Sequence, residues 1–243
     1  MLPLPKDFIF GVATADHQCE AREEYKKEWD DIRDIWEPSV GRTGRGNAVE
    51  FWDRYAADIQ LAKELGCKAF RFSVSWSRVE ADPNASLEHY ENLVDEIIHA
   101  NMNPVITLHH FVWPPHVDMI QSDFPDLFRD YTAKVVEHLN GKVKYWVPFN
   151  EQNNLVWGYI KPFWASEYGF PPGKIRQGTD EDSNKQIEDV GKLIPNLYRA
   201  YSRAYDEIKR GNPDAEVGTN PLVFGFPPWL QWLLVSRQLS NVG

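Results

Sequence analysis

An amide and a carboxylate stand side by side in Val147-Pro148-Phe149-Asn150-Glu151, directly after a β-favouring run of residues. A carboxylic acid can protonate a departing oxygen, and a neighbouring amide can hold a hydroxyl group beside the reacting bond. Cleavage of a glycosidic bond needs both functions, together with a second carboxylate that flanks the bond. No residue downstream of Glu151 has the sequence context of that second carboxylate, so the pattern predicts half of such a site.

Composition limits the classes of partner. The 243 residues are 42% hydrophobic and 26% charged, which is typical of one sizeable globular domain, and we expect residues 1–243 to form it. The formal net charge is -10 and the pI is near 5.2, whereas nucleic acid and anionic lipid both require a basic face. We therefore expect a neutral or small partner and no nucleic acid.

Cysteine usage and hydropathy indicate the compartment. Cys19 and Cys67 are too few for a disulfide scaffold and lack the paired spacing of a zinc site. Residues 1–5 contain two prolines and no basic-then-apolar run, so they do not resemble a signal peptide. The most apolar tail stretch, residues 229–235, is far shorter than the roughly 20 residues of a membrane span. We expect a reducing, cytoplasmic location and no transmembrane segment.

Strand-like and helix-like segments alternate along the chain, which is typical of an α/β fold. The expected strands are residues 8–15, 69–76, 104–111, 144–150 and 215–222. Helical spacing marks residues 51–65, with Gly66 as their stop, and a segment around Tyr90 for which Ser86 is the capping candidate. Further helices are expected at residues 124–139 and 186–210, and residues 175–185 are expected to form a polar surface loop.

Parallel strands with helical crossovers leave an open doubly wound sheet or a closed barrel. The first strand ends in Ala13-Thr14-Ala15-Asp16-His17-Gln18, which lacks the glycine fingerprint of a dinucleotide site. Gly41, Gly44 and Gly46 follow no strand and lead to no P-loop lysine, so they indicate a loop. Polar residues instead crowd the carboxyl ends of the strands, where barrel enzymes build their sites.

Five ordered motifs resemble the N-terminal portion of family 1 glycoside hydrolases, the retaining β-glucosidase and β-galactosidase group. They are residues 10–15 with Gln18 and Glu20, then residues 71–78, 107–111, 149–151 and 170–173. The resemblance implies a (β/α)8 TIM barrel of which about the first five βα units are present. Residues 13–21, 32–34 and 109–114 also look like the branch that contains the galactolipid galactosyltransferase. That branch would imply a galactolipid partner and a location at the surface of a membrane that carries galactolipids.

The resemblance implies roles for individual residues. Glu151 would be the general acid/base, and Asn150 would bind the sugar 2-hydroxyl beside the scissile bond. Gln18 and His110 would bind hydroxyls at the far side of the same sugar. Arg71 resembles the arginine that lies near the family's nucleophile, although a structural ion pair within the barrel is an equally good interpretation.

Histidine and aromatic residues also stand near the predicted strand ends. His109 and His110 lie on opposite faces of a strand and cannot reach one metal, so one should face inward and the other should pack. Most of the ten tryptophans should serve core packing, and Trp113 is the best candidate for stacking on a sugar. We expect no metal and no cofactor.

Departures from the family pattern affect the mechanism. Pro148 and Gln152 replace the usual threonine and proline around Asn-Glu, so Glu151 is expected to be less well aimed. The family's Thr-Glu-Asn-Gly nucleophile motif has no counterpart, and Glu20 would be a poor substitute. We therefore expect the barrel to be completed by a second copy, by a companion chain, or by a further part of the same protein that this sequence does not include. Three hypotheses remain, namely retaining hydrolysis, galactosyl transfer between galactolipids, and sugar binding without catalysis.

Overall fold

The computed structural model describes residues 5, 7–22, 26–139, 141–160 and 183–221, and the side chains of 157–160 and 183–187 lie outside this description. Its sheet has five parallel strands in the order β1-β2-β3-β4-β5. The strands are β1 (Gly11–Ala13), β2 (Ala69–Ser73), β3 (Asn103–His109), β4 (Tyr145–Phe149) and β5 (Glu216–Val217). Neighbours in sequence are neighbours in the sheet, which is the strand order of a barrel and confirms that prediction.

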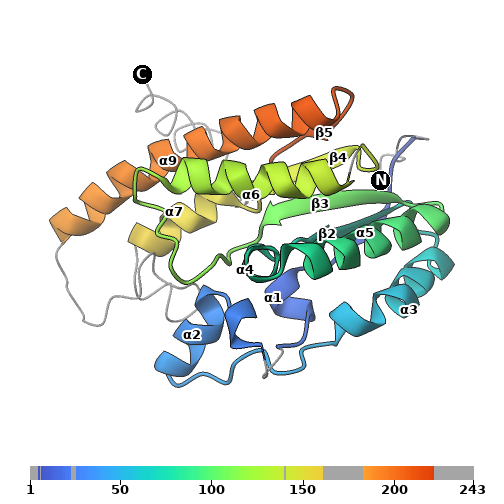
Figure 1. Ribbon diagram of the computed structural model, residues 1–243, viewed down its shortest axis with the longest axis horizontal. Coiled ribbons are helices and arrows are strands. Elements are labelled where there is room, and N and C mark those ends of the chain that lie inside the picture. The colour runs from blue at the N-terminus through green and yellow to red at the C-terminus, as the bar shows by residue number, and fades with distance from the viewer. Residues whose placement is uncertain (1–4, 6, 23–25, 140, 161–182, 222–243) are drawn as a thin grey trace.

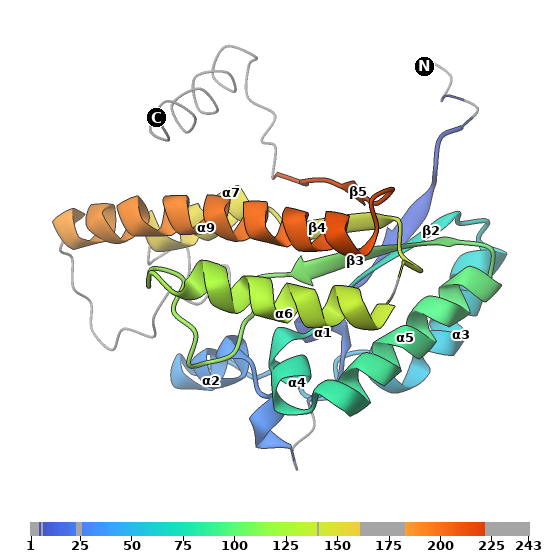
Figure 2. The same cartoon turned by 45° about the horizontal axis from the view of Figure 1, so that its top comes forward.

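Helices cover the outer face of this sheet in chain order. Figure 2 shows α3, α5, α6 and α9 following one another around the strands, and each of these helices contacts the next. Their bounds are α3 (Phe51–Glu64), α5 (Pro83–His99), α6 (Phe124–Leu139) and α9 (Ser183–Gly211). Shorter elements follow the carboxyl ends of the strands or lie near them: α1 (Asp16–Cys19), η1 (Lys27–Trp29), α2 (Ile32–Ser39), α4 (Trp76–Ala81) and α7 (Gln152–Ile160) (Figure 1).

Alternation along β2 explains how the layers form. Phe70 stacks on Phe51 of α3 and Phe72 stacks on Tyr90 of α5, and all four rings are buried. Arg71, between the two phenylalanines, points to the other face and donates from Nε to Thr107 Oγ1 at 2.7 Å. The strand thus packs its apolar face on the helices and presents a polar face to the barrel interior.

The long helices agree well with the sequence prediction, whereas the ends of several elements differ. Gly66 has φ +81 and closes α3 as expected, because a residue with a Cβ rarely adopts that conformation. The expected cap is wrong: Asp82 caps α5 by accepting from the Ala85 N–H, and Ser86 lies inside the helix and donates to the Arg78 carbonyl. The strands are shorter than predicted, and α9 begins at Ser183, inside the predicted loop.

The sheet has two outer strands among the described residues, since β1 pairs with β2 and β5 pairs with β4. Phe8, Ile9 and Phe10, just before β1, are each about half exposed at 48%, 46% and 59%. Apolar side chains beside a strand edge are the features that a further strand would cover. No helix in the described part of the chain has the length and apolar character that a membrane crossing requires. The apolar stretch at residues 229–235 lies outside the described residues.

Candidate active site

Arg71 contacts both Thr107 of β3 and Asn150, which follows β4. Arg71, on β2, donates from Nε to Thr107 Oγ1 at 2.7 Å and from Nη2 to Asn150 Oδ1 at 2.6 Å. Burial lowers the pKa of Arg71, and the negative charge of Glu151 opposes that shift, so the guanidinium lies within the electrostatic reach of Glu151. This geometry favours a site role for Arg71, because its hydrogen bonds hold the amide that precedes Glu151.

Glu151 follows β4 in a tight turn at the start of α7. Its φ is +43, a left-handed conformation that glutamate seldom adopts. The Asn154 backbone N–H donates to the Glu151 carbonyl at 2.7 Å, and Asn154 Nδ2 donates to Glu151 Oε2 at 3.1 Å. Both contacts restrain Glu151 from α7, and the expectation that Glu151 is less well aimed stays a prediction.

Asn220 is a site residue that the sequence analysis missed. It follows β5, forms an isolated parallel bridge with Asn150, and places its amide 2.7 Å from Asn150 Oδ1. Its side-chain oxygen also lies 3.4 Å from the Glu151 backbone nitrogen. With the amide rotated by half a turn, its oxygen would instead accept from Arg71 Nη1 at 3.2 Å. The signal was available: Asn220 is polar and near a strand end, but the predicted strand ran on to residue 222 and hid that position.

His109 is the last residue of β3 and His110 follows it, and the two differ in burial. His109 is 1% exposed and its ring packs against Trp113 and Phe149. His110 is partly exposed, and burial followed by the positive charge of Arg71 lowers its pKa to about 4. Its imidazole is therefore neutral at pH 7 and can both donate and accept a hydrogen bond.

Gln18 occupies an exposed position on α1, the single helical turn that follows β1. Asp16 fixes the start of this turn: its backbone N–H donates to Ser73 Oγ at 2.7 Å, and Ser73 Oγ donates to Asp16 Oδ1 at 2.7 Å. β1 and β3 run in the same direction in one parallel sheet, so their carboxyl ends lie at the same end of the sheet. Gln18 and His110 both follow these carboxyl ends. The structure thus places both predicted sugar ligands on the side of the sheet that carries Glu151.

Beside Gln18, His17 points the other way into a buried charged cluster. His17 Nδ1 lies 2.8 Å from Asp31 Oδ2, and His17 Nε2 lies 3.5 Å from Glu37 Oε2. Burial alone would lower the pKa of His17, but the hydrogen bonds to Asp31 and Glu37 outweigh it and raise the pKa to about 9. His17 is therefore charged at neutral pH, and its contacts hold α1 against α2. Gln18 is the next residue, so these contacts also fix its backbone.

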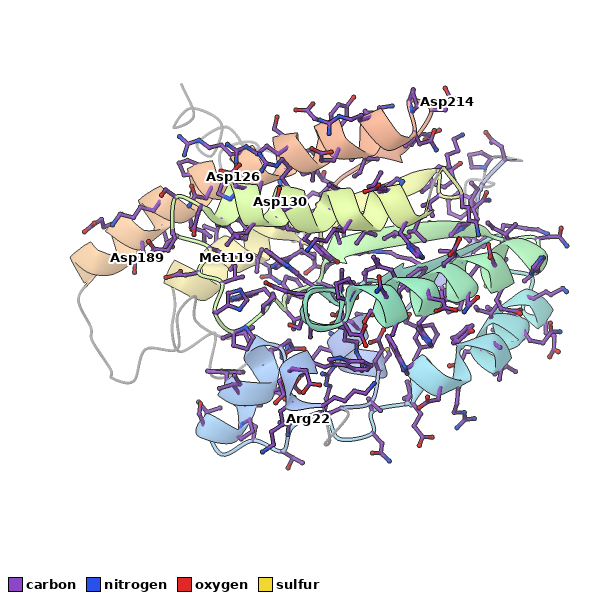
Figure 3. All side chains as sticks on the ribbon, in the orientation of Figure 1. Arg22, Met119, Asp126, Asp130, Asp189 and Asp214 are labelled. Atoms are coloured by element: carbon purple, nitrogen blue, oxygen red, sulfur yellow. The ribbon has the colours of Figure 1, made fainter. Side chains whose placement is uncertain are left out.

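Arg45 balances the remaining acids of this cluster. Arg45 Nη2 lies 2.7 Å from Asp34 Oδ2 and Nη1 lies 3.9 Å from Asp31 Oδ2. Arg22, labelled in Figure 3 at the outer side of this region, donates to both carboxylate oxygens of Asp30. His17, Asp31 and Asp34 are close enough to share a metal ion. The guanidinium and the charged imidazole already compensate these acids, so the arrangement is that of an ion-pair network.

Glu20 is enclosed and cannot act as the second carboxylate of this site. It is 1% exposed, lies 3.2 Å from Arg78 Nε, and accepts from the Tyr90 hydroxyl at 3.1 Å. Burial raises its pKa to about 7 although the charge of Arg78 works in the opposite direction. Glu20 thus holds the chain after α1 against α4 and α5. This agrees with the expectation that Glu20 would be a poor substitute for the nucleophile.

Trp113 does not present a ring to solvent, which corrects the predicted stacking role. It is 1% exposed, donates from Nε1 to the Val117 carbonyl at 3.1 Å, and stacks on His109 with 5.6 Å between ring centroids. Its carbonyl accepts from the Ile32 N–H at 2.9 Å and so connects α2 to the loop after β3. The residue is a packing residue because that loop folds inward over β3. The motif at residues 170–173 lies outside the described residues.

Comparison with known proteins finds similarity to β-glycosidases over most of the chain. The model for glycosyl hydrolase family 1 matches residues 2–226. An aryl-phospho-beta-D-glucosidase, BglC of Bacillus subtilis, is 33% identical over 230 residues, which cover 83% of this chain and 46% of that protein. A 6-phospho-beta-galactosidase of Clostridium acetobutylicum is 29% identical over 228 residues, covering 88% and 44%. The chain thus spans less than half the length of either relative.

Solved structures agree on the fold. The beta-glycosidase BGL167 has a TM-score of 0.74 and 25% identity over all of this chain and 62% of that chain. A beta-glycosidase from Pyrococcus horikoshii also has a TM-score of 0.74, at 24% identity, over 98% of this chain and 55% of its own. At 24% identity, the likeness to the second structure shows a shared fold and nothing about function. Both likenesses confirm the predicted barrel.

Proposed function

This chain belongs to glycosyl hydrolase family 1, and on that basis we propose that it provides the acid/base side of a retaining β-glycosidase acting on β-glucosides or β-galactosides. The observation that carries the proposal is the arrangement at the end of β4, where Asn150 is bound by Arg71 and followed by Glu151. We use the term assembled protein for this chain together with the segment or companion that completes its barrel. In the proposal the assembled protein is an O-glycosyl hydrolase, and this chain provides one partial barrel domain.

The chemistry follows from the positions of these groups. Glu151 protonates the departing oxygen and, in the second step, takes a proton from the attacking water. Arg71 engages Asn150 Oδ1, so the amide NH2 group of Asn150 remains to bind the sugar 2-hydroxyl. A retaining enzyme also needs a nucleophilic carboxylate about 5 to 5.5 Å away. We assign that group to a further segment or a companion chain that pairs with the outer strands of the sheet.

Gln18 and His110 form the far end of the sugar subsite in this proposal. A neutral sugar offers hydroxyls, and an amide with a neutral imidazole can satisfy them as donor and acceptor. Gln18 is exposed and His110 is partly exposed, so both can reach a ligand. Their backbones are fixed by the buried contacts of Asp16, His17 and His109 described above.

Gln18→Ala and His110→Ala are each expected to weaken sugar binding by about 1 to 3 kcal/mol, because the sugar hydroxyls lose their hydrogen-bond partners. NMR titration of the assembled protein with methyl β-glucoside and methyl β-galactoside measures the change. His99→Ala is the matched control, since His99 is exposed at the end of α5, beyond which β3 begins. Unchanged affinity for both sugars in both site variants would refute the subsite.

The reaction itself is tested by its products. We expect nitrophenyl β-glucoside or β-galactoside to give a first-formed sugar of retained β configuration, observed by NMR before mutarotation. Adding a galactolipid to the galactoside reaction distinguishes hydrolysis from galactosyl transfer. A hydrolase continues to release free galactose, whereas a transferase moves the galactosyl group to the lipid. Saturable sugar binding without turnover in every assembled form would instead support a binding module and reject the proposal.

A further inference from the structure

Asn154 touches the carboxylate of Glu151 from the first turn of α7. Its side chain is buried, at 7% exposure for the residue, and Nδ2 lies 3.1 Å from Glu151 Oε2. Its backbone N–H donates to the Glu151 carbonyl at 2.7 Å. One residue therefore restrains both the main chain and the side chain of Glu151.

This restraint matters because of the conformation in which Glu151 is held. At φ +43 a residue with a side chain is strained, and such strain persists only where surrounding contacts determine it. Asn154 supplies contacts from α7, while Asn220 approaches the Glu151 backbone nitrogen from the end of β5. The turn is thus fixed from two elements, although Gln152 lacks the rigid ring of the family's proline.

We propose that Asn154 is a positioning residue that aims the carboxyl group of Glu151, an inference that rests on the proposed function. An amide N–H that donates to Oε2 requires Oε2 to be an acceptor. Oε1 is then the oxygen left to carry the transferable proton. Asn154 thereby selects the oxygen that transfers the proton and limits rotation of the carboxyl plane.

The contact can be tested in the chain as it exists. In a 15N-labelled chain, the side-chain amide pair of Asn154 is assigned by its disappearance in Asn154→Ala. We expect this pair to shift when Glu151 is replaced by Gln, because the charged acceptor is lost. Control resonances come from Asn196, whose amide donates to the carbonyls of Met119 and Gln121. An Asn154 pair that does not respond to Glu151→Gln would overturn the proposal.

Positioning is distinguished from a general structural role by the dependence on the leaving group. Methyl β-glucoside needs protonation of its leaving oxygen, whereas 2,4-dinitrophenyl β-glucoside departs without it. In the assembled protein we expect Asn154→Ala to lower kcat/KM for the methyl glycoside about 10- to 100-fold relative to the dinitrophenyl glycoside. Asn153→Ala, one residue earlier on the same helix, should leave that ratio unchanged, and Asn154→Gln, which keeps a donor, should recover part of it.

The two arms separate the two proposals. Equal losses of kcat/KM on both glycosides would show that Asn154 only stabilises the fold, and would overturn its positioning role. A wild-type assembly that cleaves neither glycoside would reject the proposed hydrolysis, and the NMR result on Asn154 and Glu151 would then still decide whether the contact exists in solution.

Discussion

Replacing Glu151 with Gln is expected to lower the hydrolysis of an alkyl β-glycoside by about 10² to 10⁴. Glutamine keeps the shape and the capacity to accept from Asn154 Nδ2, but it cannot transfer a proton to the leaving oxygen. The left-handed turn at Glu151 and its contact with Asn154 are retained in this variant, so the loss isolates proton transfer. The measurement is kcat/KM of the assembled protein with methyl β-glucoside and methyl β-galactoside.

The substrate comparison makes this prediction specific. A glycoside with an activated leaving group should lose far less in the glycosylation step, since its departure needs little protonation. Glu137→Gln is a suitable control because Glu137 is an exposed glutamate on α6, outside the site. If the Glu151→Gln variant turned over the alkyl glycoside at the wild-type rate, the assignment of the proton donor would be wrong.

Local patterns in the sequence were sufficient for the alternation of strands and helices, and the five ordered motifs then implied the barrel. Residues 124–139 form α6 as predicted because their apolar spacing matches one helical face, and Gly66 ends α3 because its φ requires glycine. Asn150 and Glu151 follow β4 directly, at the position expected from their order in the sequence, and their catalytic roles stay a prediction. These features depend on neighbours in the chain, which a single sequence displays directly.

Features that depend on distant residues were missed. Asn220 gains its role only because β5 pairs with β4 and brings it to Asn150, a contact 70 positions along the chain. In the sequence His17 and Arg45 resemble charged surface residues. In the structure the side chain of each is buried, with Asp31 beside His17 and Asp34 beside Arg45. Trp113 was misplaced for the same reason, since the fold of the following loop decides which side of the ring is covered.

The outer strands of the described sheet are the basis for the expectation that a further strand covers them. Arg71 links β2 to β3 and to the end of β4, whereas β1 and β5 each have one paired neighbour among the described residues. Phe8, Ile9 and Phe10 expose about half of their surface beside β1. In a closed barrel the outer strands pair with further strands, which would cover these side chains and bring a second carboxylate opposite Glu151.

We therefore expect the isolated 243-residue chain to show no retaining β-glycoside turnover as a monomer, and to gain turnover only with a companion that completes the barrel. Glu20, a carboxylate that follows the first strand, is held by Arg78 and Tyr90 and cannot replace the nucleophile. Size-exclusion fractions should be assayed with 2,4-dinitrophenyl β-glucoside while native mass spectrometry records their assembly state. This substrate removes the need for Glu151 as an acid, so a missing nucleophile alone accounts for inactivity. A monodisperse monomer that releases β-glucose with retention would contradict the expectation, and would require a nucleophilic carboxylate within these residues.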